Sequence, residues 1–159
     1  LGGGFPIGVV GFQRGQPPFS SFDPLPTPHP VALAAAEAIL SILKNDAVYE
    51  QLEKRTDQLV EGLLALADRF SRPLVINRVG SVFALYFTDR PVTDHRALKV
   101  CDAETYRRMA AALRDEAILM PPEMGRAAFL SSTHGAKDID VTLEACEKVF
   151  LNLHQEDIP

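Results

Sequence analysis

The segment Leu1–Gly11, LGGGFPIGVVG, is the most informative stretch of this 159-residue sequence. Its three consecutive glycines can adopt backbone angles and close approaches that a Cβ atom forbids, so they suit a turn beside a ligand or another main chain. A flexible glycine-rich leader is the alternative. The apolar residues from Phe5 to Gly11 predict a short buried strand, which favours the turn.

The glycine pattern does not match a nucleotide-binding loop. A dinucleotide fingerprint requires G-x-G-x-x-G between a strand and a helix, and a P-loop requires G-K-[ST]; the segment contains neither. Because the chain opens on Leu1 and three glycines with no initiator methionine, we expect it to begin inside a longer polypeptide.

The composition is that of a globular protein. Apolar residues make up 47% of the sequence and charged residues 23%, and the net charge of −5 includes no basic stripe. Nucleic acid and anionic membranes are therefore not expected partners. Cys101 and Cys146 lie far apart with no C-x-x-C spacing, which indicates two reduced core thiols and favours a cytoplasmic protein.

A proline-rich stretch precedes the first predicted helix. Prolines at every second position from Pro24 to Pro30 predict an irregular loop, and Pro30 suits a first helical position with His29 just outside. The helix predicted over Val31–Lys44 is apolar nearly all round and too short to span a bilayer. We expect it to be covered on more than one side, by a missing part of the polypeptide or by a second copy of the chain.

The remaining sequence predicts an α+β domain with helices on one face of a mostly antiparallel sheet. The expected elements are a helix with one core side over Ala47–Phe70, strands over Leu74–Ile76 and Val82–Phe87 around a turn at Asn77–Gly80, a helix over Glu104–Glu116 capped by Asp102, short strands over Ile118–Met120 and Phe129–Ser131, and a helix from Gly135. The expected core residues are Phe83, Leu85, Phe87, Met109, Leu113, Leu143 and Phe150.

Two kinds of active site are disfavoured by the spacing of their residues. Ser131, Ser132 and His134 precede Asp138 and Asp140, but there is no G-x-S-x-G elbow, and a hydrolase triad is assembled across a fold. The four histidines are scattered, so no metal site is expected.

Four segments together resemble the class III aminotransferases, and within them glutamate-1-semialdehyde 2,1-aminomutase. They are LGGGFPIGVVG, NRVGSVFALYFTDRPVT (Asn77–Thr93), MPP (Met120–Pro122) and FLSSTHGAKDIDVTLEA (Phe129–Ala145), in family order and without large gaps. The resemblance implies an α/β fold-type-I PLP-dependent transferase fragment. Residues 1–46 would end the large cofactor-binding domain, and residues 47–159 would form the small α+β domain.

The resemblance also implies where the site residues lie. The family's lysine that binds pyridoxal 5'-phosphate would lie two places before Leu1, so this chain contains no catalytic residue and is expected to be inactive alone. The family's G-T-x-S-G-N-P-L-A segment carries a threonine that contacts the cofactor phosphate of the neighbouring subunit of a homodimer. Leu25 occupies the threonine position here, so either Thr27 substitutes for it or the contact is lost. Glu123 and Arg126 replace a serine and an acid near the substrate entrance.

The resemblance implies three alternative functions. The first, which the sequence favours, is the C-terminal part of an aminomutase that converts glutamate-1-semialdehyde to 5-aminolevulinate for tetrapyrrole biosynthesis. The second is the C-terminal part of a class III aminotransferase acting on another amino acid or amine. The charge changes at Glu123 and Arg126 leave the small-molecule amino substrate open. The third alternative is a non-catalytic dimerisation module.

Overall fold

The computed structural model describes residues 1–9, 13 and 29–156. The chain divides into two compact units, Leu1–Val48 and Tyr49–Pro159. Of the helices in the described ranges, none combines the length and the apolar character needed to cross a membrane.

The glycine-rich start forms a tight turn. The Phe5 amide donates to the Gly2 carbonyl at 3.0 Å, and Gly3 and Gly4 have φ values of 57° and 99°, so the predicted turn is confirmed. The predicted buried strand is wrong over residues 5–9, which form no strand, and Val9 is 76% exposed. A strand requires a backbone partner, and no described segment of this unit pairs with it.

Helix α1 spans Pro30–Leu43, close to its predicted bounds. Pro30 takes the first helical position, and the His29 ring Nδ1 accepts a hydrogen bond from the Val31 amide at 3.2 Å. Only Ala32 and Ala36 are buried, whereas Ile42 is 56% exposed. The structure contains one chain, so the expectation that another chain or domain covers α1 stays a prediction.

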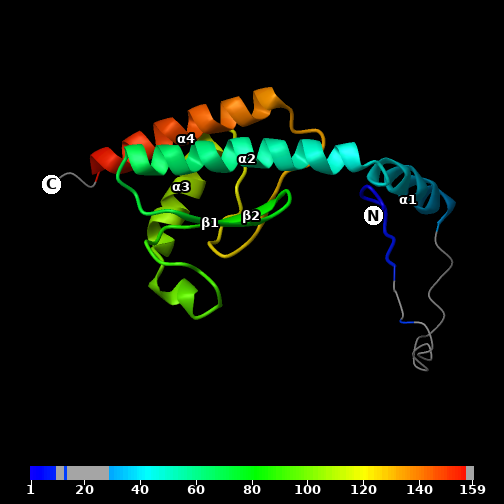
Figure 1. Ribbon diagram of the computed structural model, residues 1–159, viewed down its shortest axis with the longest axis horizontal. Coiled ribbons are helices and arrows are strands. Elements are labelled where there is room, and N and C mark those ends of the chain that lie inside the picture. Colours follow the sequence, from blue (N-terminus) through cyan, green and yellow to red (C-terminus); the bar gives the residue numbers. More distant parts are fainter. Residues whose placement is uncertain (10–12, 14–28, 157–159) are drawn as a thin grey trace. The chain divides into compact units, whose positions relative to one another are not determined.

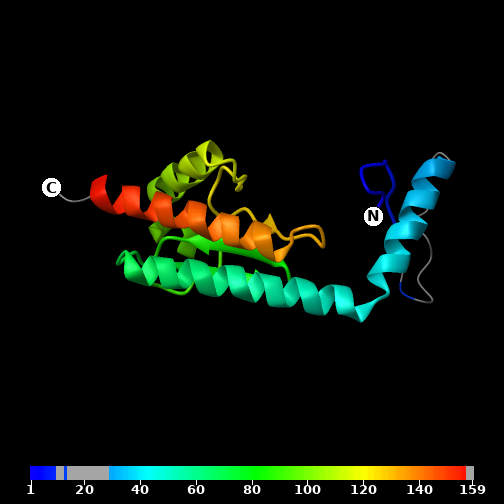
Figure 2. The ribbon, with the colours of Figure 1, turned by 90° about the horizontal axis from the view of Figure 1, so that it is seen from above.

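The second unit places helices on one face of a small sheet, as the sequence predicts. Strands β1 (Val75–Val79), β2 (Val82–Tyr86) and β3 (Ala128–Phe129) pair antiparallel in that order. Helices α2 (Asp46–Arg69) and α4 (Ala136–Glu156) run side by side above the sheet (Figures 1 and 2). Helix α3 (Ala103–Asp115) follows the short helical turn η1 (Ala97–Val100).

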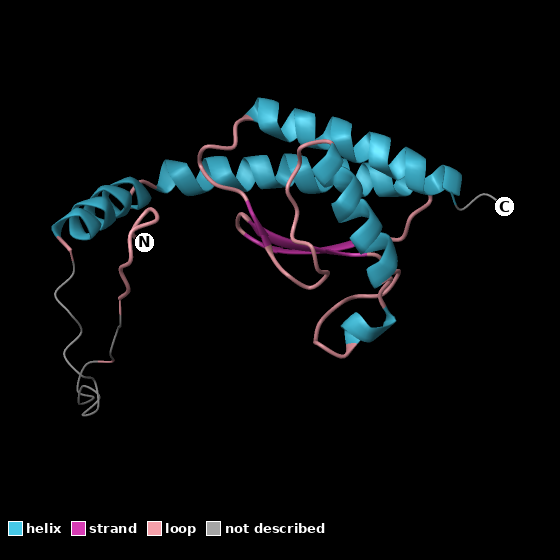
Figure 3. Cartoon of the chain, turned by 180° about the vertical axis from the view of Figure 1, so that it is seen from behind, coloured by secondary structure: helices cyan, strands magenta, loops and turns pink. Residues whose placement is uncertain are grey.

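The core lies between the sheet and the helices (Figure 3). Alternate residues of β2 point to opposite faces, so Phe83 and Leu85 enter the core while Ala84 and Tyr86 lie on the other face with Val92. The predicted core is confirmed: six of its members are buried, namely Phe83, Leu85, Phe87, Met109, Leu113 and Phe150, and Leu143 is partly buried against them.

Three local predictions in this unit are wrong. The turn between β1 and β2 contains only Gly80 and Ser81, because the backbone pairing continues to Val79, opposite Val82. Gly80 has φ 55°, which glycine adopts without strain. The segment Ile118–Met120 forms no strand, since no described strand lies beside it, and the predicted strand at Phe129–Ser131 is instead Ala128–Phe129.

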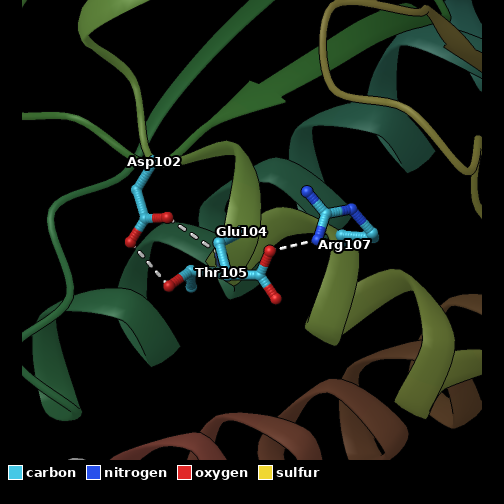
Figure 4. A network of polar contacts seen from close by, with 4 residues as sticks. All are labelled: Asp102, Glu104, Thr105 and Arg107. Atoms are coloured by element: carbon cyan, nitrogen blue, oxygen red, sulfur yellow. Dashed lines mark hydrogen bonds and ion pairs between the residues drawn. The ribbon is translucent and has the colours of Figure 1, made fainter.

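The start of α3 is held by a compact polar network (Figure 4). As predicted, Asp102 is the N-cap: its carboxylate accepts from the Thr105 amide at 2.9 Å and from the Thr105 hydroxyl at 2.7 Å. These hydrogen bonds lower the pKa of Asp102 below its ordinary value. The Asp102 amide donates to the Phe87 carbonyl at 2.9 Å, so the cap also ties α3 to the end of β2.

Candidate functional site

The segment Pro121–Arg126, here called the entrance loop, carries two of the three site residues expected from the sequence. The Arg126 Nε donates to the Glu123 Oε2 at 2.8 Å, and both side chains are 68% exposed. The Glu123 carboxylate raises the pKa of the Arg126 guanidinium above its ordinary value. The structure therefore brings Glu123 and Arg126 together as an accessible ion pair. Their place at a substrate entrance stays a prediction.

The interior of the entrance loop is shaped by a glycine and a methionine. Gly125 has φ 87°, and a Cβ atom built there would lie 3.3 Å from the Leu98 side chain. Met124 is half-buried and packs against the residues on both faces of the sheet. The Arg126 amide donates to the Glu123 carbonyl at 3.4 Å. The loop thus turns sharply while its charged side chains face solvent.

A cavity of about 720 Å³ lies beside the entrance loop. Its walls come from the segment before the loop, from β3, from the first turns of α4, and from Leu59 of α2 and Phe83 of β2. Pro121 and Pro122 belong to both the cavity wall and the loop. The polar side chains that line it are His134, Lys137, Asp138 and Thr142. Sequence reasoning missed this cavity because its walls are distant in the chain; the adjacent prolines Pro121 and Pro122 are the only local signal.

The residues Ser131–His134 form a turn rather than a catalytic triad. The His134 Nδ1 accepts from the Ser131 amide at 3.0 Å and lies 2.9 Å from the Ser131 hydroxyl. Asp138 instead accepts from the Gly135 amide at 2.7 Å and caps α4. Within the described ranges no carboxylate hydrogen-bonds to His134, so the group that would orient a catalytic imidazole is not there.

The two thiols are free, and the environment of one makes it unreactive. Burial raises the pKa of the Cys146 thiol to about 12, so it carries almost no thiolate at neutral pH. The half-buried Cys101 donates to the Ala97 carbonyl at 3.2 Å. Across residues 1–9, 13 and 29–156, no three His, Cys, Asp or Glu side chains gather in a way that could hold a metal ion.

Thr27, the expected phosphate contact, lies outside the described residues, as does Leu25. His29, the first of the four residues that match the end of the same motif, is described and serves as the N-cap of α1. The third site residue therefore stays a prediction from the sequence alone.

Solved structures of transaminases resemble this chain, whereas no protein-family model matches it. An omega-transaminase from Sphaerobacter thermophilus is 22% identical with a TM-score of 0.69, over 77% of this chain and 28% of that chain. A beta-phenylalanine aminotransferase from Variovorax paradoxus is 23% identical with a TM-score of 0.69, over 81% and 29%.

A third neighbour is the FumI protein of a Sphingopyxis species, solved in its PLP internal aldimine form. It is 25% identical with a TM-score of 0.64, over 79% of this chain and 28% of that chain. This chain thus spans less than a third of the length of these three neighbours. Its fold is that of a fragment of a fold-type-I transaminase, which confirms the fold class expected from the sequence.

The lysines of the described chain all lie on its surface. Pyridoxal phosphate requires a lysine together with an acid at its ring nitrogen and donors around its phosphate. All five lysines are exposed, at positions Lys44, Lys54, Lys99, Lys137 and Lys148. Lys137 alone of these lines the cavity beside the entrance loop, and the adjacent Asp138 is occupied as a helix cap. That the described part of the chain does not hold the cofactor by itself stays a prediction.

Proposed function

We propose that this chain is the C-terminal part of a pyridoxal-phosphate-dependent aminotransferase of class III, with its catalytic lysine before Leu1. The observation that carries the proposal is the fold, which matches part of several transaminases at TM-scores up to 0.69. In such enzymes the cofactor supplies the electron sink for amino-group transfer, and the protein binds and orients the reactants. The fold alone does not specify a substrate.

An aminomutase converting glutamate-1-semialdehyde to 5-aminolevulinate is the second candidate. It is supported by the FLSSTHGAKDID segment (Phe129–Asp140), whose spacing resembles that enzyme's sequence. The Glu123–Arg126 pair argues against it, because a basic residue replaces an acid near the expected entrance. We therefore favour an aminotransferase acting on another amino acid or amine.

In this proposal residues 1–46 complete the large domain and residues 47–159 form the small domain. Thr27 would donate to the cofactor phosphate of the neighbouring subunit, and Glu123 and Arg126 would meet the incoming substrate. The exposed apolar side chains of α1 support a homodimer or a covering domain, since water is a poor environment for them. The two free thiols support a cytoplasmic location.

The test compares the isolated 159-residue chain with the longer polypeptide that includes the upstream half. We expect the isolated chain to show no lysine-bound cofactor absorbance and no amino-group transfer. The longer polypeptide should show both, and it should prefer an amino donor with a keto-acid acceptor over glutamate-1-semialdehyde. Preference for glutamate-1-semialdehyde would establish the aminomutase instead.

Two further outcomes would refute parts of the proposal. Stoichiometric, borohydride-trapped labelling of one lysine in the isolated chain would place the active site within residues 1–159. A longer polypeptide that forms a dimer but neither binds the cofactor nor transfers an amino group would favour the non-catalytic dimerisation module.

A further inference from the structure

Tyr106 is a buried tyrosine of α3, and its hydroxyl hydrogen-bonds to a residue outside the main core cluster. Its side chain is 1% exposed and packs within the main core cluster. Its hydroxyl donates to the Pro121 carbonyl at 2.9 Å. Burial raises the pKa of Tyr106 above its ordinary value, so the hydroxyl keeps its proton and remains a donor at neutral pH.

The Pro121 carbonyl belongs to the first residue of the entrance loop. Just before the loop, the Ile118 amide donates to the Leu113 carbonyl at 2.8 Å, which ties the chain to the end of α3. Between these two points Leu119 is 85% exposed, whereas Met120 is half-buried and packs against the core. Beside the packing of Met120, the tyrosine hydrogen bond is the polar contact that holds the backbone where the loop begins.

The loop's other contacts lie further along the chain and do not replace this one. The positive φ of Gly125 shapes the middle of the turn, and Met124 packs into the core. The Glu123–Arg126 contacts join two residues of the loop to each other and so do not hold the loop to the core. A shift at Pro121 would move the charged pair together with the turn.

We propose that Tyr106 is a positioning residue for the entrance loop, holding the Pro121 carbonyl so that Arg126 meets the substrate at a fixed place. The inference rests on the proposed function, because Arg126 is placed at the entrance only there. Tyr106 touches no reacting atom; it acts through the backbone of the loop. Removing the hydroxyl leaves a half-buried carbonyl without its donor, and the loop relaxes to find another.

Tyr106→Phe in the longer, cofactor-loaded polypeptide tests the inference. The loss of one hydrogen bond of ordinary strength corresponds to about a fivefold change, so we expect KM for the amino donor to rise about fivefold. The value of kcat should stay within about twofold, since the chemical step is untouched. Trypsin cleavage after Arg126, measured well below the unfolding temperature, should be faster in the variant.

Met109→Leu is the matched control, because Met109 lies on the same buried face of α3 and makes no hydrogen bond to the loop. It should change neither KM nor the cleavage rate. An unchanged KM and cleavage rate in Tyr106→Phe, or equal changes in both variants, would overturn the inference. A parent enzyme without amino-group transfer would instead overturn the proposed function, and the cleavage rate would still decide whether Tyr106 holds the loop.

Discussion

Helices α1 and α4 are both rich in apolar residues, yet the structure buries them very differently. In α4 the residues Ile139, Val149 and Phe150 are at most 2% exposed. In α1 most of the larger apolar side chains remain exposed, with Leu33 at 48% and Ile42 at 56%. The difference arises because α4 packs against a sheet and a second helix within its own unit, whereas in α1 only the small residues Ala32 and Ala36 are buried and Ile39 is half-buried.

Apolar content alone therefore does not identify a self-contained core. A helix with apolar residues on one side and polar residues on the other needs only one side covered, and α4 is covered on that side by its own unit. A helix that is apolar all round requires partners on several sides. We expect the unit Tyr49–Pro159 to fold on its own, and α1 to reach its stable environment only with additional protein.

The largest expected effect is that of Phe150→Ala. The Phe150 ring is fully buried, with ring centroids 6.1 Å from Phe87 and 6.4 Å from Phe70. Truncation leaves a cavity, so the free energy of unfolding should fall by about 3–5 kcal/mol in urea denaturation. Ile42→Ala in α1 is the control and should change it by no more than about 0.5 kcal/mol. Equal effects would show that α1 belongs to the same core.

Gly62→Ala should have a smaller effect, at the close approach of α2 and α4. A Cβ atom there would lie 2.6 Å from both methyl groups of Leu143. Overpacking costs about 1–3 kcal/mol, more than the roughly 1 kcal/mol that alanine contributes to a helix. We expect a modest net loss of stability in thermal denaturation. In a Leu143→Ala background the same change should stabilise the protein, and a loss there as well would contradict the steric explanation.

The smallest expected effect is that of Asp102→Ala, which removes the N-cap of α3. The free energy of unfolding at pH 7 should fall by about 1 kcal/mol. Because the pKa of Asp102 is lowered on folding, its contribution is complete above the ordinary value of 3.8 and is lost as the pH falls through the lower folded pKa.

The stability difference between wild type and Asp102→Ala should therefore shrink below about pH 4, which denaturation at several pH values would measure. Asp102→Asn is the control, since an uncharged cap should retain most of the stability at pH 7 and remove most of the acid dependence. A difference that persisted undiminished at pH 2 would contradict the assigned role of the carboxylate.

Part of the candidate site could be predicted from the sequence, because its residues are neighbours in the chain. Glu123 and Arg126 are three positions apart, and the structure joins them in one loop. The bond between Tyr106 and Pro121 was not predicted, although a tyrosine on the inner face of a helix indicates that its hydroxyl requires a partner. Which acceptor it reaches depends on how α3 packs beside the loop.

The sequence by itself determined the features that depend on near neighbours: the helices from their apolar spacing, the start of α1 at Pro30, the cap at Asp102, and the turn at Gly2–Phe5. Only the tertiary structure decided which extended segments became strands. Strand pairing requires a partner from elsewhere in the chain, so β1 continued to Val79 beside β2 while Ile118–Met120, without such a partner, stayed irregular. Backbone groups find helical partners locally and sheet partners at a distance, and this is the physical reason for the division.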